Sequence, residues 1–142
     1  MATDRTSRCV WEGSLTEGKG RVTFESSGVI SDLDVTWASR TEEPQGRTSP
    51  EELIAAAHSA CFSMSLSHGL TQAGTPPERL EVAATVGFQP GEGITGVHLD
   101  LTGTVPGITE EDFVRAAETA KENCPVSQAL AVTITLDAEL TG

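Results

Sequence analysis

Three cysteines are the residues of this 142-residue chain best suited to redox chemistry: Cys9, Cys61 and Cys124. Their odd number and wide spacing do not fit the disulfide framework of a small secreted protein. The N-terminal residues lack the apolar segment of a signal peptide. We therefore expect a reducing, cytoplasmic environment, in which a thiol serves as a nucleophile, a metal ligand or a buried apolar side chain.

Cys61 lies in the middle of an apolar stretch with helical spacing. Burial alone raises the pKa of a thiol and makes it inert, so Cys61 is reactive only if a cation stabilises its thiolate. His58 lies three residues earlier on the same helical face and is one candidate for that cation. The alternative is that both residues simply pack in the core.

Cys124 lies in the sequence Asn123-Cys124-Pro125, which predicts the N-cap of a short helix. Backbone N–H groups favour an anion at that position, so the sequence by itself makes Cys124 the thiol of lower pKa. The alternative is a cysteine that only caps a turn. For Cys9, on a strand, we expect packing.

Zinc binding is an alternative use of the same residues. His58 and Cys61 could supply two ligands, with Cys124 and either His98 or His68 completing four. No CxxC or HExxH pattern supports this set. The chain also lacks the Gly-x-Ser-x-Gly elbow of many hydrolases and any phosphate-loop or dinucleotide motif.

The charge balance excludes several classes of partner. Nine basic against 21 acidic residues give a net charge of −12, which repels nucleic acid and anionic lipid. The longest apolar stretch, residues 53–70, is interrupted by serine and histidine and does not predict a membrane helix. Aromatic residues make up only 4% of the chain, which favours a core completed by oligomerisation.

The hydrophobic pattern predicts a single α+β domain over residues 1–142, in the order βββ-α-ββ-αα-β and with antiparallel sheets. Ser49-Pro50-Glu51-Glu52 predicts a capping box that opens a long helix ending near residue 73. That helix has no charge in its middle and many small residues, so we expect it to be central and enclosed on all sides. The other predicted elements are strands at 8–13, 20–25, 29–37, 80–88, 97–101 and 132–136, a polar loop at 39–48, and helices at 110–123 and 125–130.

Two cysteine motifs together resemble those of a known family. Residues 49–64 (SPEELIAAAHSACFSM) and 123–130 (NCPVSQAL) resemble the OsmC/Ohr family, that is, osmotically inducible protein C and the organic hydroperoxide resistance proteins. Residues 11–13, 18–20 and 105–108 are similar to the OsmC branch. The resemblance implies the OsmC-like fold, in which two chains form an intertwined homodimer with active sites at the subunit interface.

The resemblance also implies a thiol-dependent peroxidase that reduces organic hydroperoxides in oxidative stress defence. Cys61 matches the peroxidatic cysteine and Cys124 the resolving cysteine; an external thiol or dithiol is the reductant and no bound cofactor is needed. Arg40 matches the active-site arginine of the OsmC branch, whereas Arg21 is nearer to that of the Ohr branch. Glu51 matches the active-site glutamate.

Helix geometry adds an inference about assembly. Glu51 and Cys61 lie ten residues apart in one predicted helix, about 15 Å along its axis, so the glutamate cannot contact Cys61 of its own chain. If both serve one site, the glutamate comes from a second chain, and we expect an obligate homodimer. The alternative from another class is a redox-silent protein that binds a small ligand or zinc in the same pocket.

Overall fold

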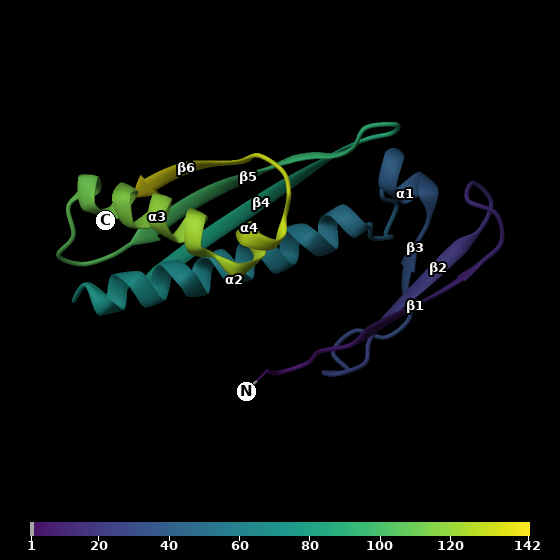
Figure 1. Cartoon of the computed structure of the whole chain (residues 1–142), viewed down its shortest axis with the longest axis horizontal. Coiled ribbons are helices and arrows are strands. Elements are labelled where there is room, and N and C mark those ends of the chain that lie inside the picture. The colour runs from purple at the N-terminus through teal and green to yellow at the C-terminus, as the bar shows by residue number, and fades with distance from the viewer. Residues whose placement is uncertain (1) are drawn as a thin grey trace. The chain divides into compact units, whose positions relative to one another are not determined.

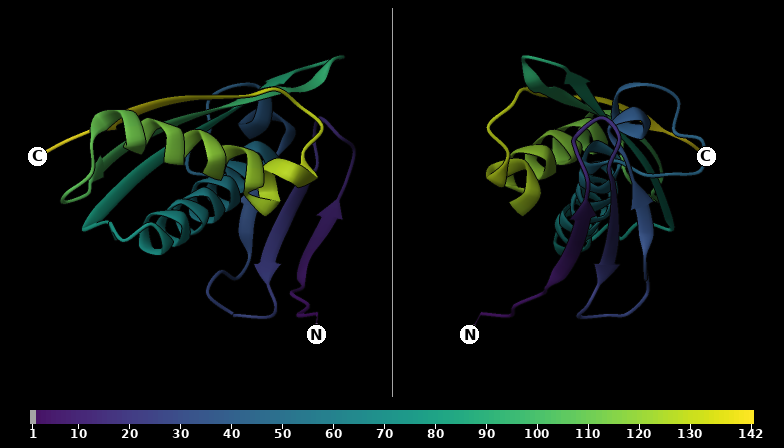
Figure 2. Two further views of the ribbon diagram at one scale, coloured as in Figure 1. Left: turned by 60° about the vertical axis from the view of Figure 1, so that its left-hand side comes forward. Right: turned by 90° about the vertical axis from the view of Figure 1, so that its right-hand side faces the viewer.

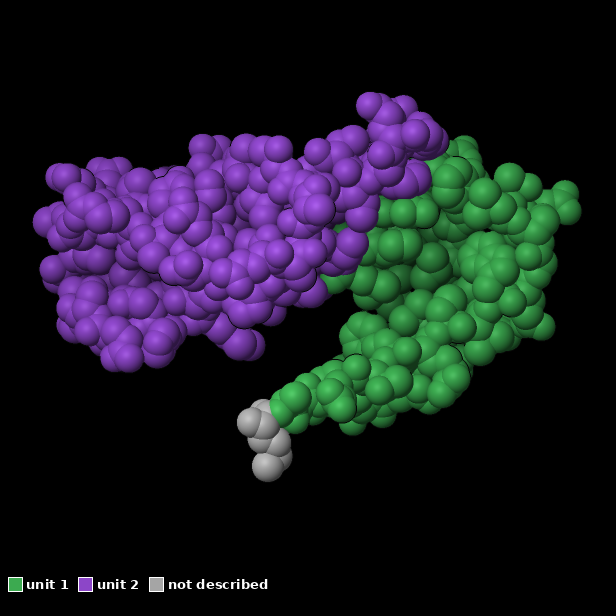
Figure 3. Space-filling model, viewed as in Figure 1, with its two compact units in different colours: residues 1–53 green, residues 54–142 purple. Residues whose placement is uncertain are grey.

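The structure is a computed structural model that describes residues 2–142. The chain divides into two compact units, with the boundary between Leu53 and Ile54 (Figure 3). Together they contain the mixture of helices and small sheets of an α+β fold, as the sequence predicts.

The N-terminal unit contains a three-stranded antiparallel sheet in the order β1-β2-β3. β1 (Ser7–Glu12) and β2 (Lys19–Phe24) form the predicted hairpin, in a register that pairs Cys9 with Val22. β3 is shorter than predicted and spans only Leu33–Val35. In the chain, the sheet precedes the two helices that carry Arg40 and Glu51.

A short helix, α1 (Trp37–Thr41), replaces the end of the predicted third strand and the start of the predicted loop. Thr36 caps it, because the Thr36 hydroxyl accepts the Ser39 N–H and the Ser39 hydroxyl accepts the Thr36 N–H, each at 3.0 Å. Because these reciprocal bonds start a helix, the strand ends at Val35, and the predicted strand over residues 29–37 is wrong at its C-terminal end.

No apolar side chain in the described part of the N-terminal unit is fully buried. Its buried positions are Gly20, Ser39, Thr48 and Glu51. Every position of β1 is exposed, Cys9 included, so the prediction that Cys9 packs in a core is wrong for this chain.

The long helix α2 spans Pro50–Gln72, close to its predicted limits. The Ser49 hydroxyl accepts the Glu52 N–H at 3.2 Å, but the Glu52 carboxylate accepts the Thr48 hydroxyl at 2.6 Å. Only one of the two bonds of the predicted capping box is therefore present. In place of the second bond, from the Ser49 N–H, the Glu52 carboxylate accepts the hydroxyl of Thr48.

α2 is buried along one side only. Its buried residues within the C-terminal unit recur with helical spacing: His58, Phe62, Leu66 and Leu70. Its other side is exposed, and Met64 there is 71% exposed. The prediction of a helix enclosed on all sides is thus not met within one chain, and an apolar surface remains open.

The C-terminal unit contains the second sheet, in the order β4-β5-β6. β4 (Arg79–Gln89) and β5 (Gly93–Thr104) form an antiparallel hairpin, as predicted, whereas β6 (Ile134–Leu140) runs parallel to β5. The helices α3 (Glu110–Asn123) and α4 (Pro125–Ala129) lie between β5 and β6 in the chain. Such a crossover returns the chain to the starting end of β5, so the last pair is parallel.

One hydrophobic core lies between the inner face of this sheet and the helices α2 and α3 (Figures 1 and 2). It is formed by Val97, Leu99 and Leu101 from β5, Phe62, Leu66 and Leu70 from α2, and Phe113, Ala117 and Ala120 from α3. Burying one leucine or phenylalanine side chain contributes about 1.5–3 kcal/mol. Cys124 lies in this core and Cys61 packs against it. No helix within residues 2–142 is long and apolar enough to cross a membrane.

Candidate functional site

Cys61 and Cys124 are brought together within the C-terminal unit. Cys61, in α2, is partly buried, and Cys124, at the N-cap of α4, is completely buried; both are free thiols. Their side chains are close enough to hydrogen-bond to each other. Residues separated by more than sixty positions thus form a thiol pair, as the family resemblance implies.

The surroundings of Cys61 within its own unit favour the neutral thiol. Burial raises the pKa of Cys61 and has the largest effect, while the adjacent Cys124 raises it further. One group acts in the opposite direction: the nearby backbone N–H of Val126 lowers the pKa of Cys61. The net direction is upward, so these groups alone do not produce a reactive thiolate.

His58 does not supply the missing positive charge. Its side chain is completely buried, and burial lowers the pKa of the imidazole, so the ring is neutral near pH 7. Its Nε2 atom is 2.8 Å from the hydroxyl of Ser127 in α4, and its Nδ1 atom has no hydrogen-bond partner among the described residues. His58 therefore links α2 to α4 and is not a cationic partner of Cys61.

Arg40 and Glu51 form a second pair, within the N-terminal unit. The guanidinium Nε is 3.0 and 3.1 Å from the two carboxylate oxygens of Glu51, and Nη2 is 2.8 Å from Oε2. The Glu51 side chain is 7% exposed and that of Arg40 is 27% exposed. The Arg40 guanidinium also lies 5.9 Å from the ring centroid of Trp37. The two-point bond fixes the orientation of a partly buried positive charge.

Arg21, the other candidate arginine, has a different partner. It lies on β2 and binds Glu12 of β1 at 3.0 Å; the Arg21 side chain is partly exposed and that of Glu12 is largely exposed. The glutamate that the sequence predicts for the site is therefore paired with Arg40 and not with Arg21. Arg40 is therefore not an isolated solvated charge, because two of its nitrogens bind the Glu51 carboxylate.

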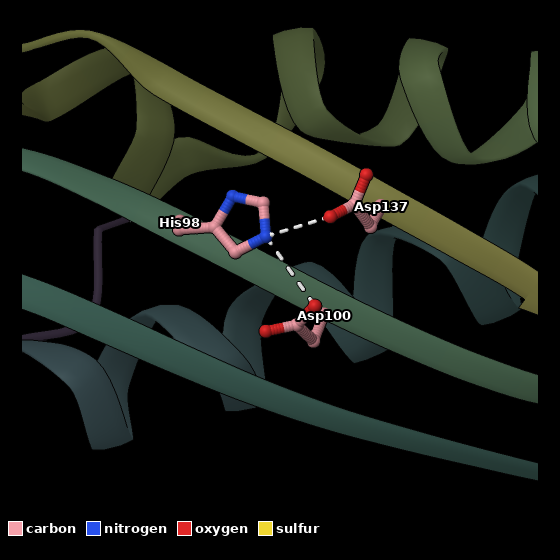
Figure 4. Close-up of side chains that lie close together, drawn as sticks. All are labelled: His98, Asp100 and Asp137. Atoms are coloured by element: carbon pink, nitrogen blue, oxygen red, sulfur yellow. Dashed lines mark hydrogen bonds and ion pairs between the residues drawn. The ribbon is translucent and has the colours of Figure 1, made fainter.

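The zinc ligands considered from the sequence do not converge: His58, Cys61 and Cys124 form no cluster with His98 or His68 among the described residues. His98 lies with Asp100 and Asp137 on the outer face of the sheet, where its Nε2 is 3.3 and 3.1 Å from their carboxylates (Figure 4). This trio is the one group within residues 2–142 in which three metal-ligating side chains converge. The His98 Nδ1 is 2.6 Å from the Thr135 hydroxyl, so both ring nitrogens already have protein partners.

A cavity of about 620 Å³ lies between the C-terminal half of α2 and α3. Two of the residues that line it are close in sequence to the cysteines. Ser65 follows Cys61 by one helical turn, and Asn123 directly precedes Cys124. Its size is in the range of small-molecule sites in proteins.

Val126 and Ser127 are the residues of this region that sequence reasoning missed. Val126 acts through its backbone N–H, which no side-chain pattern reveals. Ser127 lies within the second motif, three residues after Cys124. Its hydrogen bond to His58, however, depends on how α4 packs against α2. The signal that could have found it is a buried histidine that requires a polar partner.

Comparison with known proteins agrees with these features. The family model described as OsmC-like protein matches residues 42–139. The chain is 41% identical to Peroxiredoxin OsmC of Escherichia coli (strain K12), over 99% of both chains. It is 32% identical to the organic hydroperoxide resistance protein-like 2 of Staphylococcus saprophyticus, over 66% of this chain and 68% of that protein.

A solved structure supports the fold. The crystal structure of an organic hydroperoxide resistance protein OsmC from Legionella pneumophila superposes with a TM-score of 0.65. It is 22% identical in sequence, and the match covers 96% of this chain and 97% of that one.

Proposed function

Because this chain belongs to the OsmC-like family, we propose that it is a thiol-dependent peroxidase that reduces organic hydroperoxides in the cytoplasm as part of oxidative stress defence. The observation that carries the proposal is that the Cys61 and Cys124 thiols are close enough to interact, as a proposed nucleophile and its resolving group must be. The names of relatives, a peroxiredoxin and hydroperoxide resistance proteins, agree with it.

In the proposed reaction the Cys61 thiolate attacks the terminal oxygen of ROOH and the O–O bond breaks. The alkoxide takes up a proton and leaves as the alcohol, and Cys61 becomes a sulfenic acid. The Cys124 sulfur then attacks the Cys61 sulfur, which forms the disulfide and releases the sulfenic oxygen as water. An external thiol or dithiol returns two electrons and restores both thiols.

Arg40 is the cation proposed to activate Cys61. A thiol whose pKa is raised by burial requires a positive charge nearby to ionise at neutral pH, and His58 is neutral. A guanidinium also donates hydrogen bonds to a departing oxygen, and the Glu51 carboxylate holds its orientation. Because Glu51 and Cys61 lie ten residues apart in α2, we propose that the Arg40–Glu51 pair of a second chain serves each Cys61.

Two features of the single chain favour this homodimer. The N-terminal unit buries no apolar side chain of its own in its described part, and a small sheet without a core is marginally stable at best. In addition, α2 exposes an apolar side that includes Met64. A second copy of the chain would cover such surfaces and complete a site to which each chain contributes different residues.

The cavity beside α3 favours a second candidate function, a binding protein for a small apolar ligand whose thiols take no part. The two functions differ in what the thiols do. A binding protein retains ligand affinity when both cysteines are replaced, whereas a peroxidase loses its activity.

The test is peroxide consumption by cysteine variants with a dithiol as reductant. We expect Cys61→Ser to abolish turnover of an alkyl hydroperoxide. Cys124→Ser should complete one turnover and then accumulate over-oxidised Cys61, because nothing resolves the sulfenic acid. Cys9→Ser is the matched control and should behave like the parent, since Cys9 lies exposed on β1. Equal rates for the Cys61→Ser variant and the parent would overturn the proposal.

A further inference from the structure

The segment that carries Cys124 contacts the helix that carries Cys61 at three points. The Ser127 hydroxyl is 2.8 Å from His58 Nε2, and the Cys124 thiol and the Val126 N–H both lie close enough to the Cys61 sulfur to change its pKa. His58 and Cys61 lie three residues apart on one side of α2. Cys124, Val126 and Ser127 lie within four consecutive residues at the start of α4.

Of these contacts, only the one between His58 and Ser127 involves no reacting atom. The thiols change their covalent state whenever Cys61 is oxidised, and the Val126 N–H contacts a sulfur that changes with them. The His58–Ser127 bond is short, at 2.8 Å, and buried, since His58 is 0% exposed and Ser127 is 9% exposed. It is therefore the contact that can persist through both oxidation states.

The bond is also difficult to replace. The Nδ1 atom of His58 already lacks a hydrogen-bond partner among the described residues, so Ser127 is the one polar group that satisfies the ring there. A buried polar group without a hydrogen-bond partner is unfavourable. If the neutral His58 ring donates from Nε2 to Ser127, the unpartnered Nδ1 is an acceptor and no N–H of the ring is left unpaired. Removing the Ser127 hydroxyl would leave the whole imidazole unsatisfied in the core, so the ring and α4 would shift.

We propose that His58 and Ser127 are positioning residues, whose hydrogen bond holds the first turn of α4 on α2 so that the Val126 N–H stays on the Cys61 sulfur and the Cys124 thiol stays within reach of it. Neither residue contacts the substrate in this role. The part that concerns disulfide formation rests on the proposed peroxidase function; the part that concerns the Val126 N–H does not.

The first measurement follows the alkylation of Cys61 by iodoacetamide as a function of pH, with the Cys61 peptide quantified by mass spectrometry. Ser127→Ala should move the midpoint to higher pH, because the Val126 N–H no longer stabilises the thiolate. Ser63→Ala is the matched control, because the Ser63 hydroxyl donates only to the Ser59 carbonyl within α2, at 2.7 Å. It should leave the midpoint unchanged.

The second measurement treats the reduced protein with an alkyl hydroperoxide and compares disulfide with Cys61 sulfinic acid. In Ser127→Ala the ratio of disulfide to sulfinic acid should fall roughly tenfold, the factor that follows from losing one hydrogen bond of ordinary strength. Ser127→Thr keeps the hydroxyl and should restore both readouts, whereas the isosteric Ser127→Val should not. A lower overall stability does not by itself change this ratio, so the ratio separates positioning from a merely structural role.

The outcomes separate the two proposals. If the parent protein forms no disulfide with peroxide, the peroxidase function fails, and the alkylation midpoint still decides whether Ser127 positions Val126. If Ser127→Ala fails to fold, the comparison of Ser127→Thr with Ser127→Val decides in its place. Variants without the hydroxyl that match the parent in both readouts would overturn the inference.

Discussion

Replacing Arg40 by methionine tests how Cys61 is activated. Methionine retains much of the length of arginine but removes the positive charge and the two-point bond to Glu51. A free thiol has a pKa near 8.5, so at pH 7 only about 3% of it is ionised. Burial and the neighbouring Cys124 raise the pKa of Cys61 and reduce that fraction further. If Arg40 provides the charge that ionises Cys61, its loss should slow the attack on peroxide at least about thirtyfold.

The assay is stopped-flow oxidation of the reduced protein by an alkyl hydroperoxide between pH 6 and pH 9. In Arg40→Met the rate should rise about tenfold per pH unit throughout the range in which Cys61 is still protonated, whereas the parent should be nearly independent of pH around neutrality. Arg21→Met is the matched control, because Arg21 pairs with Glu12 on the exposed face of β2. An Arg40→Met rate within threefold of the parent at pH 7, or a loss in Arg21→Met instead, would refute this account of activation.

Three further predictions concern stability, measured by urea unfolding. Glu51→Gln should lower the free energy of unfolding by about 1.5–3 kcal/mol, because Arg40 loses charge-assisted hydrogen bonds in a partly buried setting; an unchanged value would contradict this. Burial lowers the pKa of His58, so below about pH 6.5 the unfolded chain binds more protons at this residue than the folded one. The parent should therefore lose up to about 1.4 kcal/mol relative to His58→Gln between pH 7.5 and 5.5, and parallel curves would count against a buried neutral ring. Gly103→Ala should cost about 1–3 kcal/mol, because its Cβ would lie 2.6 Å from Phe113 Cζ, and an equally stable variant would show that the core yields at that point.

The sequence predicted those features that depend on local patterns. Ser49 and Pro50 identified the start of α2, and alternation identified the β4–β5 hairpin. The two cysteine motifs identified the family. These signals succeed because a helix start, a hairpin turn and a motif are each encoded within a few neighbouring residues.

The sequence was misleading at one local choice between strand and helix, and at two features that depend on contacts between distant residues. Thr36 and Trp37 continue the alternation of a strand, but the reciprocal bonds between Thr36 and Ser39 start α1 instead. The direction of β6 depends on the crossover through α3 and α4, which periodicity does not describe. His58 looked like a candidate cation because its partner, Ser127, lies 69 residues away and only the packing of α4 brings the two together.

The most direct test of the proposed peroxidase is a count of thiols after one equivalent of an alkyl hydroperoxide is added to the fully reduced protein. If Cys61 and Cys124 react as proposed, two of the three thiols disappear, mass spectrometry finds a bond between Cys61 and Cys124, and Cys9 stays free. Three unreacted thiols would contradict the peroxidase and favour the small-ligand binding protein. A disulfide that includes Cys9 would contradict the roles assigned to the pair.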